Sequence, residues 1–204
     1  MPRARYALIA REGWIFILAE AVLTVTVFYY FGLLPALLPL ALLIWLILLF
    51  RDPLRAIPSA PLAVVSPVDG RVFAVENTQD PALKREAIRI AIRINHLGAY
   101  IARSPVEGKL LDVPEQAQDG KRRALRLTTD EGDDVVLLIH GRRWLGKPRA
   151  FPRYGERLGQ GQRFAYLRFA ALAEVFVPAN SRVQVKVGDY VTAATDPIAT
   201  LIHD

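Results

Sequence analysis

Few residues of this chain could carry out chemistry, and their types exclude several reactions. The 204-residue sequence contains no cysteine and three histidines, at positions 96, 140 and 203. The absence of cysteine excludes disulfides, thiolate zinc sites, iron–sulfur clusters and cysteine nucleophiles. The wide spacing of the three histidines argues against a histidine-rich metal site, so no metal is expected.

One candidate acid–base residue is Asp69, within the segment Ser-Pro-Val-Asp-Gly-Arg-Val at 66–72. The segment recurs 38 positions later as Ser-Pro-Val-Glu-Gly-Lys-Leu at 104–110. In both copies proline fixes φ, and an acidic residue precedes a glycine that can take the positive φ of a turn. Two interpretations stay open: two similar β-turns, or a pseudo-symmetric β-sandwich in which each copy opens a strand. Asp69 itself can be only a turn residue, since Asp before Gly is common in turns.

The elements that position Asp69 are expected to be β-strands. From residue 63 onward, short β-rich runs recur, many alternate with period two, and Gly, Asp, Asn and Pro separate them. In the run 88–94, four isoleucines fall on one face, and Arg89 and Arg93 fall on the other. Apart from one helical turn at 81–85, no run beyond residue 50 favours a helix. The pattern predicts a β-rich, mostly antiparallel sandwich or barrel over 63–204. The expected strands are 62–65, 71–75, 88–94, 109–113, 123–129, 134–140, 173–177, 182–187 and 197–202.

The C-terminal stretch 185–201 resembles the strand–turn–strand elements of biotinyl- and lipoyl-like barrels. Gly188 and Asp189 stand at its turn. Such carriers need a modifiable lysine at a hairpin tip, and Arg71 occupies the corresponding place here. A carrier function is therefore not expected.

The N-terminal part predicts a membrane anchor over residues 1–50. Residues 14–50 contain one charged side chain, Glu20, which we expect near the interface or facing a neighbouring helix. The block divides into spans at 14–32 and 33–50, with a turn at Gly32–Pro35. A full span needs about 20 apolar residues, so two short spans or a re-entrant hairpin both fit. A Pro-rich linker, 51–62, follows. The apolar stretch is too long for a cleaved signal peptide.

Basic residues on both sides of the apolar block place both ends on the cytoplasmic side of the membrane. The whole chain has 26 Lys and Arg against 20 Asp and Glu, a net charge of +6. Basic clusters at 121–123 and 142–143 favour attraction to anionic lipid, at about 1 kcal/mol per residue. No aromatic RNA-binding signature accompanies them, so no nucleic acid partner is expected.

Four segments resemble the short bacterial and archaeal phosphatidylserine decarboxylases. They are FRDPLRAIP (50–58), VVSPVDGRV (64–72), YIARSPVEGKL (100–110) and GERLGQGQRFAYLRFAALAEVFVP (155–178), in the family's order behind a hydrophobic region. The resemblance covers essentially the whole chain. It implies a proenzyme that cuts itself between Gly and Ser and converts the Ser into a pyruvoyl group. That group takes up the substrate amine and accepts electrons as CO2 leaves.

The sequence departs from the family pattern at the positions that carry this chemistry. The family's catalytic Asp corresponds to Asp69, but its Gly–Ser pair corresponds to Ala170 and Ala171, and its His corresponds to Tyr100. Alanine has no hydroxyl, so self-cleavage and pyruvoyl formation cannot occur there. A phenol with a pKa of about 10 is a poor base at neutral pH. No cofactor is therefore expected in this chain.

Two residues could replace what is missing. His96 lies four positions before Tyr100, which along a strand is a displacement of about 13 Å. Ser181 lies in a turn-like segment beyond Pro178. Neither is a strong substitute, and His140 and His203 are expected to be structural or exposed.

Two hypotheses remain. The first is a non-catalytic relative at the cytoplasmic membrane that binds aminophospholipid or a protein partner, as a homodimer or with an active decarboxylase. The second is an active decarboxylase that makes the ethanolamine lipid. In both, the resemblance implies that Asp69, Tyr100 and the Ala170–Ala171 peptide converge on one pocket.

Overall fold

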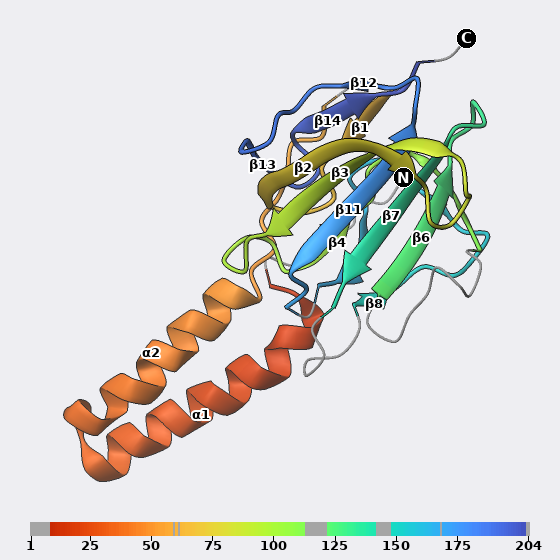
Figure 1. Ribbon diagram of the computed structural model, residues 1–204. Coiled ribbons are helices and arrows are strands. Elements are labelled where there is room, and N and C mark those ends of the chain that lie inside the picture. The colour runs from red at the N-terminus through yellow and green to blue at the C-terminus, as the bar shows by residue number, and fades with distance from the viewer. Residues whose placement is uncertain are drawn as a thin grey trace. The chain divides into compact units, whose positions relative to one another are not determined.

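The chain consists of two compact units, residues 1–54 and 55–204. The computed structural model describes residues 9–58, 60, 62–112, 122–141, 148–167 and 169–202 (Figure 1). The division between the units falls inside the segment for which the sequence predicts a linker. The domain limits 1–50, 51–62 and 63–204 stay predictions.

The N-terminal unit is a pair of apolar helices. A 3-10 turn, η1 (Arg11–Gly13), leads into α1 (Trp14–Phe31), and α2 (Leu33–Leu49) returns beside it (Figure 1). The connection is tighter than the predicted Gly32–Pro35 turn, because Gly32 alone reverses the chain with φ of +82°. Proline is tolerated in the first turn of α2, where its missing N–H has no helical partner. The far ends meet where the Ala10 N–H donates to the Phe50 carbonyl at 2.8 Å.

One stretch of this unit is long and apolar enough to cross a membrane. It runs over Arg11–Phe31, 21 residues, whereas α2 is shorter than a full span. Most large apolar side chains of the two helices are exposed within the unit. Glu20 is partly buried on α1. Length and composition thus agree with the predicted anchor, and its place in a membrane stays a prediction.

The second unit is built of strands, and every strand pairing among the described residues is antiparallel. The largest sheet has the order β13-β2-β3-β11-β7-β6-β5-β9, and smaller sheets have the orders β1-β14-β12 and β4-β10-β8. The strands are β1 (Ala63–Val65), β2 (Gly70–Gln79), β3 (Glu86–Ile94), β4 (Ile101–Arg103), β5 (Gly108–Leu111), β6 (Arg122–Thr128), β7 (Asp134–His140), β8 (Arg149–Ala150), β9 (Arg157–Leu158), β10 (Arg163–Tyr166), β11 (Leu172–Pro178), β12 (Arg182–Val183), β13 (Tyr190–Val191) and β14 (Pro197–Thr200).

The antiparallel, β-rich prediction is confirmed, and several details differ. As far as the described residues extend, no sheet closes into a barrel. The single helical turn expected at 81–85 is present: the Lys84 N–H donates to the Asp80 carbonyl at 2.8 Å, and the Asp80 side chain accepts from the Ala82 N–H at 2.8 Å. Of the strand expected at 182–187, only Arg182–Val183 pairs. The sandwich and the biotinyl-like tail stay predictions.

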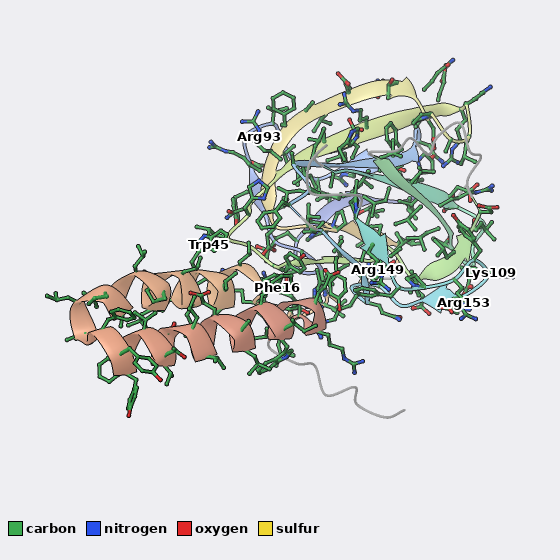
Figure 2. All side chains as sticks on the ribbon, turned by 90° about the horizontal axis from the view of Figure 1, so that it is seen from below. Phe16, Trp45, Arg93, Lys109, Arg149 and Arg153 are labelled. Carbon is green, nitrogen blue, oxygen red and sulfur yellow. The ribbon has the colours of Figure 1, made fainter. Side chains whose placement is uncertain are left out.

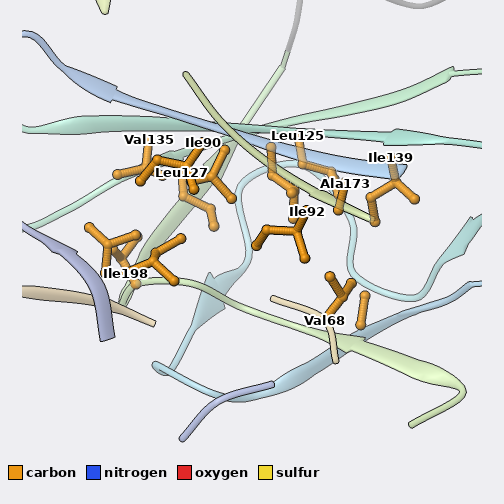
Figure 3. Packing of buried hydrophobic residues seen from close by; sticks show 14 of the residues in the cluster. Val68, Ile90, Ile92, Leu125, Leu127, Val135, Ile139, Ala173 and Ile198 are labelled. Carbon is orange, nitrogen blue, oxygen red and sulfur yellow. The ribbon is translucent and has the colours of Figure 1, made fainter. Parts of the chain in front are cut away.

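The main core lies on one face of the large sheet. The alternation in β3 is as predicted: Ile88, Ile90, Ile92 and Ile94 belong to the core, and the arginines between them face outward. Figure 3 shows Ile90 and Ile92 packed with side chains of β6, β7 and β14. Each fully buried isoleucine contributes about 1.5–3 kcal/mol, so this face anchors the strand that reaches the candidate site.

The two Ser-Pro-Val copies are related by reciprocal contacts. Gly70 opens β2 and Gly108 opens β5. The Val65 N–H donates to the Pro105 carbonyl at 2.8 Å, and the Arg103 N–H donates to the Pro67 carbonyl at 2.9 Å. In each copy the serine hydroxyl also donates to the valine carbonyl two residues on, at 2.7 Å. The repeat is therefore a structural pair in which each copy opens a strand.

Candidate functional site

Asp69 is a buried carboxylate held by three donors. It ends the first Ser-Pro-Val-Asp turn, just before β2, and is 3% exposed. Its Oδ2 accepts from the Arg55 guanidinium at 2.5 Å and from the Ala99 N–H at 2.8 Å. Its Oδ1 accepts from the Ala193 N–H at 2.7 Å. These bonds satisfy both oxygens of a carboxylate that is buried away from water.

The second copy of the repeat shows what this turn requires by itself. Glu107 occupies the position equivalent to Asp69, yet its side chain is 58% exposed and meets Arg157 at the surface, at 3.0 Å. The same turn therefore forms without a buried acid. The burial of Asp69 and its three donors go beyond the needs of a β-turn, which favours the site interpretation of Asp69.

The turn after β3 closes over the Asp69 side chain. It runs from Asn95 to Ala99, and Gly98 lies against the carboxylate. A Cβ at Gly98 would lie 2.6 Å from the Asp69 Cβ and 2.9 Å from Oδ2, so no larger residue fits without movement. The glycine thus allows the backbone to approach closely enough for the Ala99 N–H to reach Oδ2.

Ala170 and Ala171 lie where the chain enters β11. Phe169 has a φ of +60°, which bends the chain just before the pair. The Ala171 N–H donates to the His140 carbonyl at 3.1 Å, and its carbonyl accepts from the Ile94 N–H at 3.0 Å. Both backbone groups of Ala171 therefore join the hydrogen bonding of the large sheet, between β3 and β7.

Backbone contacts bring the Asp69 and Ala171 positions to the same end of β3. The Asn95 N–H donates to the Asp69 carbonyl at 2.8 Å, next to the Ile94 N–H that serves Ala171. Because one residue of extended chain advances about 3.3–3.6 Å, the Asp69 and Ala171 carbonyl oxygens are within about 10 Å of each other.

Tyr100 is connected to both positions. It directly follows Ala99, whose N–H binds Asp69. Its carbonyl accepts from the Leu167 N–H at 3.0 Å, and the Leu167 carbonyl accepts from the Ala170 N–H at 2.9 Å. The buried Tyr100 ring lies 5.8 Å from the Tyr166 ring, centroid to centroid. A phenol in an aromatic setting thus stands where the family resemblance implies a histidine.

The position of His96 differs from the estimate made along a strand. β3 ends at Ile94, so His96 lies in the following turn, and its ring is 6.3 Å from that of Phe169, centroid to centroid. His96 is therefore close to the residue that precedes Ala170. Ser181 is not brought to this place, because it follows β11 at the end opposite to Ala171. His203 and the basic cluster at 142–143 lie outside the described residues, as do Lys121 and the side chains of Arg122 and Arg123.

A charged network crosses the outer face of the large sheet next to the site. Arg89 binds the carboxylates of Glu76 and Glu174, and His140 Nε2 lies 2.5 Å from the second Glu174 oxygen. Burial raises the pKa of Glu174, but the hydrogen bonds from His140 and Arg89 outweigh burial and lower it overall. The network joins β2, β3, β11 and β7 and holds Glu174 ionised.

Two further features bear on ligand binding. No group of three or more His, Asp or Glu side chains that could hold a metal occurs within the described part of the chain. A hollow of about 460 Å³ opens at the far end of β2 and β3 from Asp69. It is lined by Asn77, Thr78, Gln79, Glu86, Ala87 and Ala179.

Comparison with known proteins gives a consistent result. The family model described as phosphatidylserine decarboxylase matches residues 42–199. The chain is 36% identical to the phosphatidylserine decarboxylase proenzyme of Nitrosomonas eutropha, over 95% of both chains. It is 34% identical to the Burkholderia ambifaria proenzyme, over 96% of this chain and 97% of that one. No solved structure matches.

The β unit thus brings a buried turn aspartate close to the start of β11, and both segments are among those that resemble the decarboxylase family. The chain belongs to the phosphatidylserine decarboxylase family. Family members derive their pyruvoyl group from their own chain. The resemblance of segment 155–178 puts Ala171 at the position of the family's serine, and alanine does not fit that group because it has no hydroxyl oxygen to become the ketone.

Sequence reasoning missed Arg55 as a site residue. In the sequence it is one of the basic residues that follow the apolar block, whereas in the structure its guanidinium is the one side-chain cation on Asp69 among the described contacts. The available signal was the shared family segment 50–58, which contains it.

Proposed function

We propose that this chain is a non-catalytic member of the phosphatidylserine decarboxylase family that binds aminophospholipid at the cytoplasmic face of the membrane. The observation that carries the proposal is Ala171 at the position of the pyruvoyl-forming serine. Self-cleavage needs a hydroxyl that attacks the preceding carbonyl, and a methyl group cannot do so. Without a carbonyl electron sink, the carbanion left by CO2 has no place to delocalise.

The environment of Ala171 supports the same reading. Its N–H and its carbonyl are both bound within the sheet, to His140 and Ile94. The family's base position is Tyr100, which is buried beside Tyr166. Nucleophile and base are therefore absent together. The absence of both groups favours loss of the whole reaction. Exchange of a single residue would leave the other group in place.

What remains is suited to binding. The Asp69 carboxylate has about four acceptor positions, and the described donors fill three of them. One more donor, such as the ammonium of an aminophospholipid, can be accepted at Oδ1. The apolar helices of residues 1–50 would keep the site at the bilayer. A homodimer, or a complex with an active decarboxylase, would be compatible with this role.

An active decarboxylase is the second candidate. It is favoured by the identity to relatives that are named decarboxylase proenzymes. It would require a carbonyl group from another source, since Ala171 supplies none. An agent that reduces Schiff bases would abolish such activity.

The decisive experiment compares three purified full-length chains on phosphatidylserine in detergent micelles, and it measures both cleavage of the chain and release of CO2. The natural chain should release none. The Ala170→Gly/Ala171→Ser variant should cleave slowly, and addition of Tyr100→His should accelerate cleavage, because the nucleophile is restored first and the base second. CO2 from the natural chain would contradict the proposal.

Binding is measured separately. Nanodiscs with phosphatidylserine should bind the natural chain more tightly than nanodiscs with phosphatidylglycerol, which has the same net charge without the amine. Equal binding to the two would remove the aminophospholipid from the proposal.

A further inference from the structure

Four large apolar side chains of the β unit are exposed close to the Asp69 end of the large sheet. Phe73 is 54% exposed, Leu97 55%, Val187 62% and Tyr190 58%. Phe73 stands at a register shift between β2 and β3, where one extra residue of β2 has no partner. Such a bulge re-aims the side chain, here toward the outside of the sheet.

Hydrogen bonds join these residues into one surface. Tyr190 pairs in register with Arg71 of β2, and its hydroxyl accepts from the Asn95 side chain at 3.0 Å. The same Asn95 accepts the Leu97 N–H at 3.0 Å. Arg71 Nε donates to the Gly188 carbonyl at 2.7 Å, next to Val187. Segments far apart in sequence are thus fixed side by side.

Cations accompany the apolar residues. Arg93 lies over the Phe73 ring, with its guanidinium carbon 5.1 Å from the ring centroid, and faces Arg71 in register. Lys186 is exposed in the adjacent turn. Like charges opposite each other are unfavourable in water, but they become favourable against an anionic surface. We call Arg71, Phe73, Arg93, Lys186, Val187, Tyr190 and Leu97 the Phe73–Tyr190 surface.

Carboxylates nearby do not cancel these charges. Asp189 directs its Oδ2 to the Lys186 backbone N–H at 2.8 Å. Glu76 and Glu174 both bind Arg89, farther along the sheet. The second half of the repeat differs, because its Arg157 is bound by Glu107 and Asp130 together. Among the described contacts, Arg71, Arg93 and Lys186 therefore form no ion pair with these carboxylates, whereas Arg157 of the other half is paired with two.

We propose that the Phe73–Tyr190 surface rests on an anionic bilayer. Exposed aromatic and aliphatic side chains surrounded by arginine and lysine are the composition of an interfacial membrane contact. The surface is continuous with the site, since Asn95 binds both the Tyr190 hydroxyl and the Asp69 carbonyl. Contact with lipid here would bring headgroups to Asp69. In this respect the inference rests on the proposed function.

The chain has no cysteine, so a single introduced cysteine can carry a fluorophore at a chosen position. Val187→Cys labels the surface, and Lys109→Cys labels β5 of the other repeat half, at the position equivalent to Arg71. Figure 2 shows Arg93 on the side of the β unit away from Lys109 and Arg153. The full chain is reconstituted into vesicles of phosphatidylcholine with 30% or no phosphatidylglycerol, and nitroxide lipids serve as quencher.

The label at 187 should be quenched strongly in anionic vesicles and weakly in neutral ones, and the label at 109 should be quenched weakly in both. Arg71→Gln/Arg93→Gln should reduce the docked-to-undocked ratio about thirtyfold, because each basic residue near such a surface contributes about fivefold. Arg149→Gln/Arg153→Gln, two exposed arginines elsewhere on the unit, should leave the ratio unchanged.

Equal quenching at 187 and 109, or no effect of the Arg71 and Arg93 changes, would overturn the inference. A concentration-dependent change of the 187 label in detergent without lipid would assign the surface to a second copy of the chain and would also overturn it. None of these readouts depends on phosphatidylserine. Failure of the surface and failure of aminophospholipid binding are therefore distinguishable.

Discussion

Replacing Asp69 by Asn tests whether this residue is more than a turn residue. The change keeps the shape of the side chain and removes its charge. The amide NH2 takes the place of one of the two oxygens. In one orientation it faces the Ala193 N–H, and in the other it faces both the Ala99 N–H and Arg55. At least one buried donor loses its partner, which costs about 1–3 kcal/mol. Loss of one member of a buried ion pair raises the total to about 3–5 kcal/mol.

The repeat supplies the matched control. Glu107→Gln removes the equivalent acid from an exposed ion pair with Arg157 and should cost at most about 1 kcal/mol. For a unit of this size, 1 kcal/mol corresponds to about 2–4 °C in Tm, so Asp69→Asn should lower Tm by about 6–20 °C and Glu107→Gln by less than about 4 °C.

The assay is thermal unfolding of the full chain in detergent, followed by circular dichroism in the strand region. Arg55→Gln and the double variant Asp69→Asn/Arg55→Gln complete a cycle that isolates the pair, whose changes should not be additive. If Asp69→Asn lowers Tm no more than Glu107→Gln does, the reasoning that separates Asp69 from an ordinary turn aspartate is refuted.

Further predictions concern the surroundings of the site. Gly98→Ala should lower Tm by several degrees because its Cβ meets Asp69 at 2.6 Å, whereas Gly159→Ala, whose nearest contact is 3.6 Å, should change it little. Stability of the natural chain should fall as pH drops below about 4.5, because the folded pKa of Glu174 is lowered and its contribution is present above the unfolded pKa. Glu174→Gln should flatten that acid limb in pH-dependent unfolding. Ile90→Ala should cost about 2–5 kcal/mol by chemical unfolding, from the cavity it leaves. An unchanged acid limb, or an unaltered Tm for Gly98→Ala, would contradict these contacts.

The long strands could be predicted because their side chains alternate. β3 shows this best, because its isoleucines occur at every second position and all pack into the core on one face of the sheet. The strands that the sequence did not predict, β4, β8, β9 and β10, are two to four residues long, too short for a periodic pattern. They are defined by their partners and not by their own sequence.

The site was predictable in part. Asp69 could be identified from its motif. Its ion pair with Arg55 could not, because the two residues lie 14 positions apart, in a linker and a turn, and no sequence pattern connects them. The placement of His96 depended on where β3 ends. Asn95, whose side chain accepts the Leu97 N–H, begins a turn there, and the sequence Asn-His-Leu-Gly carries that signal.

The central claim is that this family member is not processed, and the intact mass of the purified natural chain tests it most directly. The account predicts a single species near 22.8 kDa. The Ala170→Gly/Ala171→Ser/Tyr100→His variant serves as the reference for cleavage at the same peptide. Two fragments of the natural chain, divided between residues 170 and 171, would contradict the account.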